Sequence, residues 1–216
     1  MAQMQATFLD NWMKVTGQVL HGESYFPAIK PTGGSDAQMF SSSPSSGSEN
    51  MALMYKIALT AANESIDLSM AYFVPDESSS KVLIEAMRRG VKLRIITPGK
   101  ITDTQTVRAA SRQTWGPLLK AGAQIYEFQP SMYHCKVMII DGSMVSVGST
   151  NFDARSFRLN DEANLNIYDI KFASRQTRLF EDDLKKSRQI SFEEWEARPL
   201  KERALELVGV LLSSQL

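Results

Sequence analysis

The sequence has one cysteine, two histidines and no long apolar run among its 216 residues. The lone Cys135 excludes an internal disulfide framework. Histidine, cysteine and carboxylate residues do not cluster at metal-site spacing, so we expect a mechanism without metal or cofactor. No stretch reaches the roughly 18 apolar residues that a membrane-spanning helix needs. We also expect no secretory signal, because the first residues lack a basic region followed by an apolar run.

Charge is balanced, because the chain has 24 Lys and Arg residues against 24 Asp and Glu residues. Tight binding to a phosphate backbone usually requires a basic surface, so this composition disfavours nucleic acid as a partner. The basic residues Lys185, Lys186 and Arg188 are typical of a solvated helix face. An apolar fraction of 43% in a chain of this length predicts a folded protein with a sizeable core.

Hydrophobic periodicity predicts helices over residues 3–20, 49–63, 81–89, 104–119, 172–186 and 193–212. Short apolar runs bounded by turn residues predict strands over residues 66–73, 91–97, 123–128, 136–140, 144–147 and 163–168. Residues 33–48, rich in Gly, Ser and Pro, are predicted to form a mobile loop. That loop ends an N-terminal segment, 1–48, made of a helix and a linker, which we expect to be the tail of a preceding first half, and a catalytic domain follows over 49–216. The alternation indicates an α/β fold, a layered α-β-α sandwich with a mixed central sheet.

The most informative stretch runs from residue 134 to residue 151. His134 and Lys136 stand two apart on a predicted strand, so their side chains point to the same face. That face carries a potential nucleophile beside a fixed positive charge. The residues at 148–151, Gly-Ser-Thr-Asn, form a small-residue turn that can bring a hydroxyl and an amide close to an anion. Together these groups predict a phosphoryl-transfer site that needs no metal.

The chemistry assigns a role to each polar group. Neutral imidazole can attack phosphorus and form a covalent phosphohistidine, so we predict that His134 is catalytic; the alternative is a satisfied core histidine. Lys136, Ser149 and Asn151 can donate to the phosphoryl oxygens, which gain charge during attack. The second ring nitrogen of the histidine needs an acceptor, and Glu162, at the start of the next strand, is the candidate.

Other polar residues have simpler interpretations. Asp141 follows a strand and precedes a glycine, so it either takes part in catalysis or holds a turn. Arg155 contacts phosphate or stands in solvent as a turn residue. His21, just after the first helix, is predicted to be a surface cap. Cys135 lies between the histidine and the lysine, so it should point away from them into packing.

The pattern H-x-K-x4-D-x6-G-S-x-N, with Asp141 as its aspartate, resembles the motif of the phospholipase D superfamily. The resemblance extends along nearly the whole chain. The segments that look like the C-terminal half of bacterial cardiolipin synthases are 71–77, 89–94, 122–127 and 148–157. The segments that resemble the region just after the first catalytic motif of those enzymes are 11–12, 16–17 and 25–27.

This resemblance implies a phospholipase D-like domain and a role for each motif residue. His134 would be the nucleophile or the general acid. Lys136, Ser149 and Asn151 would bind the phosphate, and Glu162 would match the acidic residue that orients the histidine. The fold and these roles are expectations that follow from the family.

The sequence departs from the family in having one motif where the family uses two. In the family, one histidine attacks and the other protonates the leaving alcohol. His21 cannot supply the second motif, because no lysine or asparagine follows it at motif spacing. General acid catalysis contributes roughly two to four orders of magnitude in rate. The partner histidine must therefore come from a preceding first half or from a second copy paired about a two-fold axis.

The leading hypothesis is a transphosphatidylase of the cardiolipin synthase type. It would join two molecules of phosphatidylglycerol, an anionic phospholipid, and release glycerol through a phosphatidyl-His134 intermediate. We expect peripheral contact with the cytoplasmic side of the bacterial cell membrane. The alternatives are a homodimeric phosphodiesterase or nuclease and a motif-bearing domain without turnover. The helix over 193–212 is predicted to pack on the core rather than to touch a membrane, and the sequence leaves open whether 33–48 forms a lid.

Overall fold

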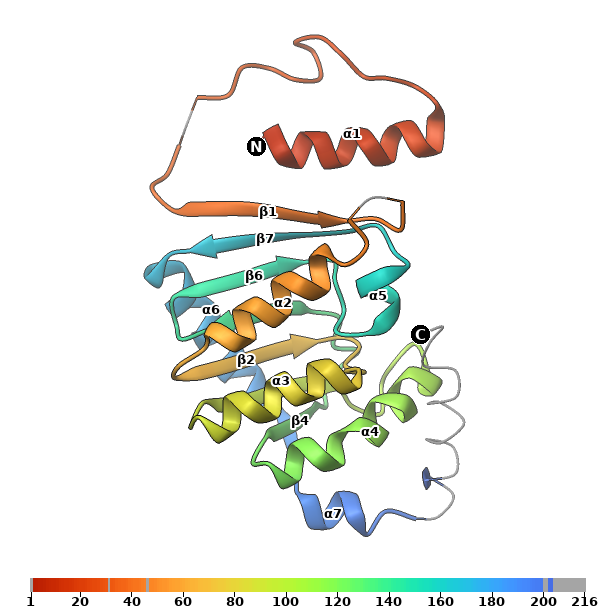
Figure 1. The fold of residues 1–216 in the computed structure, drawn as a ribbon, viewed down its shortest axis with the longest axis vertical. Coiled ribbons are helices and arrows are strands. Elements are labelled where there is room, and N and C mark those ends of the chain that lie inside the picture. Colours follow the sequence, from red (N-terminus) through yellow and green to blue (C-terminus); the bar gives the residue numbers. More distant parts are fainter. Residues whose placement is uncertain (1, 31, 46, 200–201, 204–216) are drawn as a thin grey trace.

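The computed structural model describes residues 2–30, 32–45, 47–199 and 202–203. Within them the strands form one mixed eight-stranded sheet (Figure 1). In spatial order the strands are β1 (Asp36–Ser42), β7 (Glu162–Tyr168), β6 (Met144–Gly148), β5 (Lys136–Ile140), β2 (Ser65–Met70), β3 (Lys92–Pro98), β4 (Gln124–Phe128) and β8 (Ser187–Ile190). Strands β2, β3 and β4 run parallel, and the other neighbouring pairs run antiparallel. The predicted α/β fold with a mixed sheet is confirmed.

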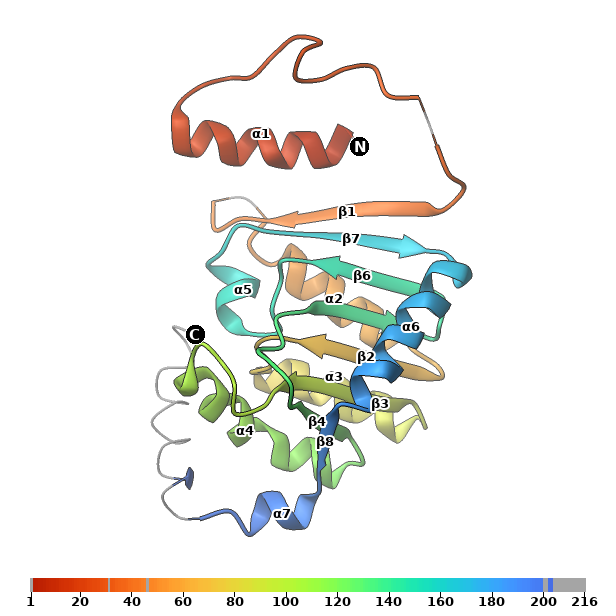
Figure 2. The ribbon, with the colours of Figure 1, turned by 180° about the vertical axis from the view of Figure 1, so that it is seen from behind.

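Helices lie on both faces of the sheet. The described helices are α1 (Ala2–Thr16), α2 (Asn50–Ala61), α3 (Glu77–Arg88), α4 (Gln105–Lys120), α5 (Ala154–Arg158), α6 (Ile170–Leu184) and α7 (Phe192–Glu196). α2, α3 and α4 cover the face that is nearer in Figure 1, and α6 covers the opposite face, seen in Figure 2. α1 lies beyond the β1 edge of the sheet. The layers therefore have the order helix, sheet, helix.

Local chemistry explains why these elements begin where they do. The Asp76 carboxylate accepts the Ser79 backbone N–H at 2.6 Å and caps α3. Asp153 caps α5 in the same way, through the backbone N–H of Ser156 at 2.7 Å. Every residue of β3 after Lys92 is buried, as expected for a parallel strand with helices on both faces. Caps and burial together fix the central part of the fold.

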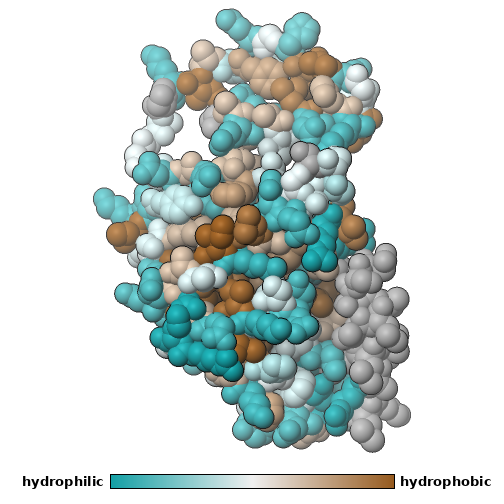
Figure 3. Space-filling model, in the orientation of Figure 1, coloured by the Kyte–Doolittle hydropathy of each residue, from teal (hydrophilic) through white to brown (hydrophobic). Residues whose placement is uncertain are grey.

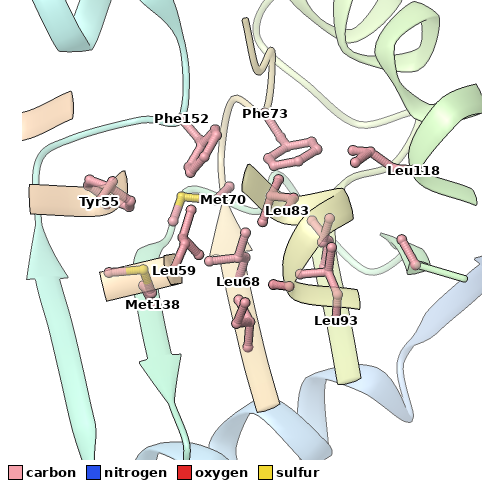
Figure 4. Packing of buried hydrophobic residues seen from close by; sticks show 14 of the residues in the cluster. Tyr55, Leu59, Leu68, Met70, Phe73, Leu83, Leu93, Leu118, Met138 and Phe152 are labelled. Atoms are coloured by element: carbon pink, nitrogen blue, oxygen red, sulfur yellow. The ribbon is translucent and has the colours of Figure 1, made fainter. Parts of the chain in front are cut away.

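The larger apolar core lies between the sheet and the layer of α2, α3 and α4. Figure 4 shows Tyr55 and Leu59 of α2 close to Leu68 and Met70 of β2, with Phe152 beside Tyr55. All five side chains are at most 1% exposed. Fully burying a large apolar side chain contributes roughly 1.5–3 kcal/mol. A second, smaller cluster packs beneath α6 on the other face. The core thus fixes the strands whose ends carry the motif.

Apolar side chains also remain on the surface, as Figure 3 shows for the face of Figure 1. On α2, Leu53 and Ile57 are 57% and 60% exposed. α1 buries none of its residues, and its Phe8 is 53% exposed. An ion pair between Lys14 and Asp161, at 3.1 Å, connects α1 to the loop before β7. α1 therefore contributes little apolar burial to the fold.

The prediction of a mobile loop over residues 33–48 is wrong for the central part of that segment. Residues Asp36–Ser42 form β1, which pairs antiparallel with β7 along its whole length. An edge strand has one neighbour and leaves most of its side chains in water, so its sequence need not alternate strongly. A composition rich in serine therefore concealed a strand. β1 is an edge strand rather than a lid, and it joins the segment 1–48 to the sheet.

Other differences concern element ends and short elements. α1 ends at Thr16 rather than near residue 20, because Gly17 adopts a left-handed φ of 69°. The predicted helix over 193–212 is interrupted: α7 ends at Glu196, and Pro199 lacks the backbone N–H that a continuing helix needs. Residues 204–212 of that prediction lie outside the described residues. The short elements α5 and β8 were not predicted, because so few residues show no period.

Candidate active site

Three neighbouring antiparallel strands bring all the motif residues except Asp141 to one end of the sheet. Lys136 opens β5, Gly148 closes β6 and Glu162 opens β7. Val147 pairs with Val137, so the chain register places Lys136 beside Gly148. Gly148 pairs in turn with the residue at 164 on β7. This end of the sheet lies beside α5 (Figures 1 and 2). The sheet thus gathers residues that are up to 28 positions apart in sequence.

His134 and Lys136 lie side by side, as their spacing predicts. The Lys136 Nζ is 3.1 Å from Nε2 and 3.3 Å from Nδ1 of the histidine ring. An ammonium can donate to a ring nitrogen that carries no proton. Such a nitrogen is present in neutral imidazole, the form of histidine that attacks phosphorus. Burial lowers the pKa of Lys136, while the nearby Glu162 carboxylate acts in the opposite direction. His134 itself is exposed, so the core-histidine alternative does not apply.

Tyr72 is a neighbour of His134 that the sequence analysis missed. Its ring meets the His134 ring edge to face, with centroids 6.4 Å apart. Its hydroxyl donates to the Asp103 carboxylate at 2.6 Å. Burial, together with this hydrogen bond, raises the pKa of Tyr72, and the bond lowers the pKa of Asp103. The position of Tyr72, just after strand β2 and next to β5, was the available signal.

Ser149 and Glu162 form a hydrogen-bonded pair. The Ser149 hydroxyl donates to the Glu162 carboxylate and accepts the Ala163 backbone N–H at 3.1 Å. Asn160 donates to the other Glu162 oxygen at 3.1 Å. Among the described residues, His134 makes no hydrogen bond to Glu162. The reason is that β6 lies between β5 and β7, which are therefore two strand spacings, roughly 10 Å, apart. The orienting role of Glu162 stays a prediction without a contact in this single chain.

Asn151 faces a cavity of about 240 Å³ next to Tyr72. The cavity is also lined by Arg155 and Asn160. The amide oxygen of Asn151 is buried and has no hydrogen-bond partner among the described residues. Arg155 therefore lies beside the predicted phosphate-binding amide, in a position compatible with its predicted phosphate contact. Tyr72 lines this cavity and also contacts the His134 ring, so it connects the hollow at Asn151 with the histidine.

A second cleft, of about 690 Å³, reaches Ser149 and Glu162 from the side of α1. Its walls include Asn11 of α1 and Ser42 of β1. Two of the predicted phosphate-binding residues therefore line different hollows, Asn151 one and Ser149 the other. Among the described residues, no group of three or more histidine, cysteine or carboxylate side chains could hold a metal ion.

Asp141 does not join these groups. It lies beyond the opposite end of β5 from His134, and the five residues of that strand alone span roughly 17 Å. Its carboxylate accepts the backbone N–H groups of Asn63, Glu64 and Ser65 at 2.8–3.0 Å. Burial alone would raise the pKa of Asp141, but these three bonds outweigh it and lower the pKa. With a left-handed φ of 50°, the residue holds a turn, the alternative weighed from the sequence.

Two minor predictions have opposite outcomes. Cys135 is half-buried in the apolar cluster beneath α6, and burial raises the pKa of its thiol, so packing is confirmed. His21 was predicted to be a cap of the first helix, but α1 already ends at Thr16 and His21 lies exposed in the following segment. That prediction is wrong because Gly17, not Gly22, ends the helix.

A family model described as "Cardiolipin synthase, PLD-like domain" matches residues 55–184, more than half of the chain. The chain belongs to this family. The matched region of this cardiolipin synthase PLD-like domain contains the whole motif. The predicted resemblance is therefore confirmed.

Similar proteins agree with this assignment. A cardiolipin synthase of Geobacillus sp. (strain WCH70) is 35% identical over 97% of the chain, which covers 42% of that protein. The major cardiolipin synthase ClsA of Bacillus subtilis (strain 168) is 35% identical over 97% of the chain, which covers 44% of that protein. This PLD-like chain therefore spans less than half the length of the curated relatives it matches.

Solved structures show the same fold. Nuc, a phospholipase D family member from Salmonella typhimurium, matches with a TM-score of 0.62 at 22% identity, over 73% of this chain and 99% of its own. The phosphatidylserine synthase of Haemophilus influenzae matches with a TM-score of 0.68 at 14% identity, over 87% of this chain and 49% of its own. Among the described residues of this PLD-like chain, no helix is both long and apolar enough to span a bilayer.

Proposed function

We propose that this chain provides one of the two halves of a phosphatidyl-transferase active site, of the kind that makes cardiolipin. The observation that carries this proposal is the exposed His134 ring with the Lys136 Nζ within 3.3 Å of both of its nitrogens. The hollow at Asn151 offers a side-chain amide that can donate to a phosphodiester, and a second hollow reaches Ser149, whose hydroxyl donates to Glu162. The membership of a cardiolipin synthase family and the relatives' names support a phospholipid substrate.

The first chemical step forms a covalent intermediate. A proton-free nitrogen of His134 attacks the phosphorus of phosphatidylglycerol, and the phosphorus–oxygen bond to the glycerol headgroup breaks. The leaving oxygen takes a proton from the histidine of the partner motif. Lys136 stabilises the charge that develops on the phosphoryl oxygens. Glycerol departs, and the phosphatidyl group stays on His134.

The second step returns the enzyme to its starting state. The partner histidine, now neutral, removes a proton from a hydroxyl of a second phosphatidylglycerol. The resulting oxygen attacks the phosphorus and breaks the phosphorus–nitrogen bond to His134. The products are cardiolipin and the glycerol released earlier, so no atoms are gained or lost.

The partner motif is provided by a first half of the polypeptide or by a second copy of this chain. The relatives are more than twice the length of the matched region, which favours a first half. Two copies paired about a two-fold axis would also place two histidines in one site. Because the substrates are bilayer lipids, we place the protein peripherally at the bacterial membrane, on its cytoplasmic side.

The proposal is tested by the mass-spectrometric detection of cardiolipin after incubation with phosphatidylglycerol vesicles. His134→Ala is compared with His21→Ala, which removes the other histidine of the chain. Where the chain pairs with a second copy or is combined with a first half, we expect product from the unmodified chain and from His21→Ala, and at least ~100-fold less from His134→Ala. Equal product from His134→Ala would sink the catalytic assignment.

Three further experiments separate the alternatives. Intact-protein mass spectrometry after lipid addition detects a phosphatidyl adduct, which the covalent step predicts even where the second half-reaction is slow. Incubation with plasmid DNA tests the phosphodiesterase alternative, and DNA cleavage without any lipid product would favour it. Sedimentation of the active species should show two motifs per particle; a turning-over monomer with one motif contradicts the composite site.

A further inference from the structure

We propose that Tyr55 and Asn164 are positioning residues that hold the phosphate-binding turn Ser149–Asn151 in place. Neither residue belongs to the motif, and they come from α2 and β7, on separate parts of the chain. The inference rests on the phosphate site of the proposed function. It adds the side chains that set the geometry of that site.

Asn164 uses its full hydrogen-bonding capacity inside the core. Its amide oxygen accepts the Thr150 backbone N–H at 3.3 Å and the Thr150 hydroxyl at 2.8 Å. Its amide nitrogen donates to the Tyr55 hydroxyl at 3.3 Å and to the Ser146 hydroxyl at 3.0 Å. A side-chain amide offers two donors and an acceptor oxygen with two lone pairs, and all are occupied. The amide is therefore locked in one orientation.

Tyr55 completes the clamp from the helix side. Its hydroxyl donates to the Thr150 carbonyl at 3.4 Å. Burial raises the pKa of Tyr55, so the hydroxyl keeps the proton that it donates. The ring packs edge-on against Phe152, 5.5 Å between centroids, and against Phe157 at the same distance. The hydroxyl is thus held by a rigid ring rather than by a flexible side chain.

Both backbone groups of Thr150 are bound by these two side chains. Thr150 stands between Ser149 and Asn151, the two predicted phosphate donors, so its peptide planes set the directions of both neighbours. Tyr55, Thr150 and Asn164 are at most 1% exposed, and water does not compete for these bonds. A fully satisfied buried network rigidifies the segment it binds, and removing one member leaves the others unpaired.

The turn has no room to move in other directions. A side-chain carbon added at Gly148 would lie 2.2 Å from both the Ala163 carbonyl oxygen and the Asn164 amide oxygen. On the far side, Phe152 pairs with Phe73, with its N–H bonded to the Tyr72 carbonyl at 3.0 Å. The clamp therefore holds the middle of a segment whose two ends are fixed by the sheet.

The experiment measures the binding of inorganic phosphate to the chain by isothermal titration calorimetry. Tyr55→Phe removes the hydroxyl and keeps the ring, and Thr150→Val removes the other hydroxyl without a change in shape. Each variant should weaken phosphate binding roughly three- to tenfold, the range for one lost hydrogen bond. Thr150→Ser, which keeps the hydroxyl, should bind phosphate as tightly as the original chain does.

A matched control separates positioning from general destabilisation. Ser111→Ala removes a buried hydroxyl that accepts the Trp115 Nε1–H at 3.1 Å, on α4 and outside the clamp. We expect it to lower the thermal midpoint as much as Tyr55→Phe does, with unchanged phosphate affinity. Unchanged affinity in both Tyr55→Phe and Thr150→Val, or an equal loss in Ser111→Ala, overturns the proposal.

The outcomes also distinguish this inference from the proposed function. Phosphate binding that depends on Tyr55 and Thr150, in an assembly that holds both motifs but forms no cardiolipin, would support the clamp and refute the transfer reaction. Cardiolipin synthesis with unaltered rates in both variants would support the reaction and refute the clamp. A chain that binds no phosphate at millimolar concentration would overturn the clamp, because there would be no site to position.

Discussion

Gly148→Ala should be among the most damaging small substitutions in this protein. The added methyl carbon would lie 2.2 Å from the Ala163 carbonyl oxygen, which is backbone, and 2.2 Å from the oxygen of the Asn164 side-chain amide, a group held by four hydrogen bonds. Neither neighbour can rotate away, so β6 and β7 must separate locally. Overpacking of this kind costs about 1–3 kcal/mol, and the rigid neighbours place the expected cost at about 2–3 kcal/mol.

Urea unfolding, followed by circular dichroism, measures this change in the free energy of unfolding. Gly34→Ala is the matched control, because nothing lies within 4 Å of its added carbon and its φ is not left-handed. The control should stay within ~0.5 kcal/mol of the original chain. Calorimetry should also show weaker phosphate binding in Gly148→Ala alone. A Gly148→Ala chain as stable as Gly34→Ala would refute the close approach on which the reasoning depends.

Three other predictions follow from buried groups. Asp141→Asn should cost about 1–3 kcal/mol, because it weakens three backbone hydrogen bonds. The pKa of Asp141 is lower in the folded chain, so its stabilisation is present above the unfolded pKa, ~4, and is lost as the pH falls through the folded pKa. The free energy of unfolding of the variant should therefore depend less on pH below ~4 than that of the original chain. An equal pH dependence in the two chains would contradict this. Cys135→Ala should keep phosphate binding and activity, since the half-buried thiol has a raised pKa; loss of activity at unchanged stability would give the thiol a chemical role. Asp67→Ala should destabilise by about 3–5 kcal/mol in thermal unfolding, because it removes the two carboxylate oxygens that bind the buried Arg94 guanidinium at 2.7 Å; a cost below ~1 kcal/mol would show that the remaining Glu181 contact suffices.

The chemistry of the site could be predicted from sequence where it depends on short-range geometry. His134 and Lys136 stand two apart in extended backbone at the start of β5, and the side-chain alternation of such backbone places them together. The turn after β6 could also be predicted from the sequence, because the small residues at 148–151 fit few other structures. The pair His134 and Lys136 and the turn at 148–151 are local features, so their prediction required no knowledge of which strands are neighbours.

Pairing between distant segments could not be predicted in the same way. The partner of Glu162 is Ser149, not His134, and this depends on β6 lying between β5 and β7. The clamp on Thr150 joins residues 95 and 14 positions away, which no periodicity reveals. β1 was missed for the same reason, because an edge strand is defined by its neighbour rather than by its own composition.

The pairing of β1 with β7 has a consequence for how the chain folds. Asp36 pairs with Tyr168 and Ser42 with Glu162, so this ladder closes a loop of more than a hundred residues. Contacts so distant in sequence form late, because the loss of loop entropy comes before the contacts repay it. During synthesis β1 leaves the ribosome well before β7, its strand neighbour among the described residues, exists. The wall of the cleft beside Ser149 should therefore be among the last parts of the molecule to assemble, and the β2–β3–β4 core among the first.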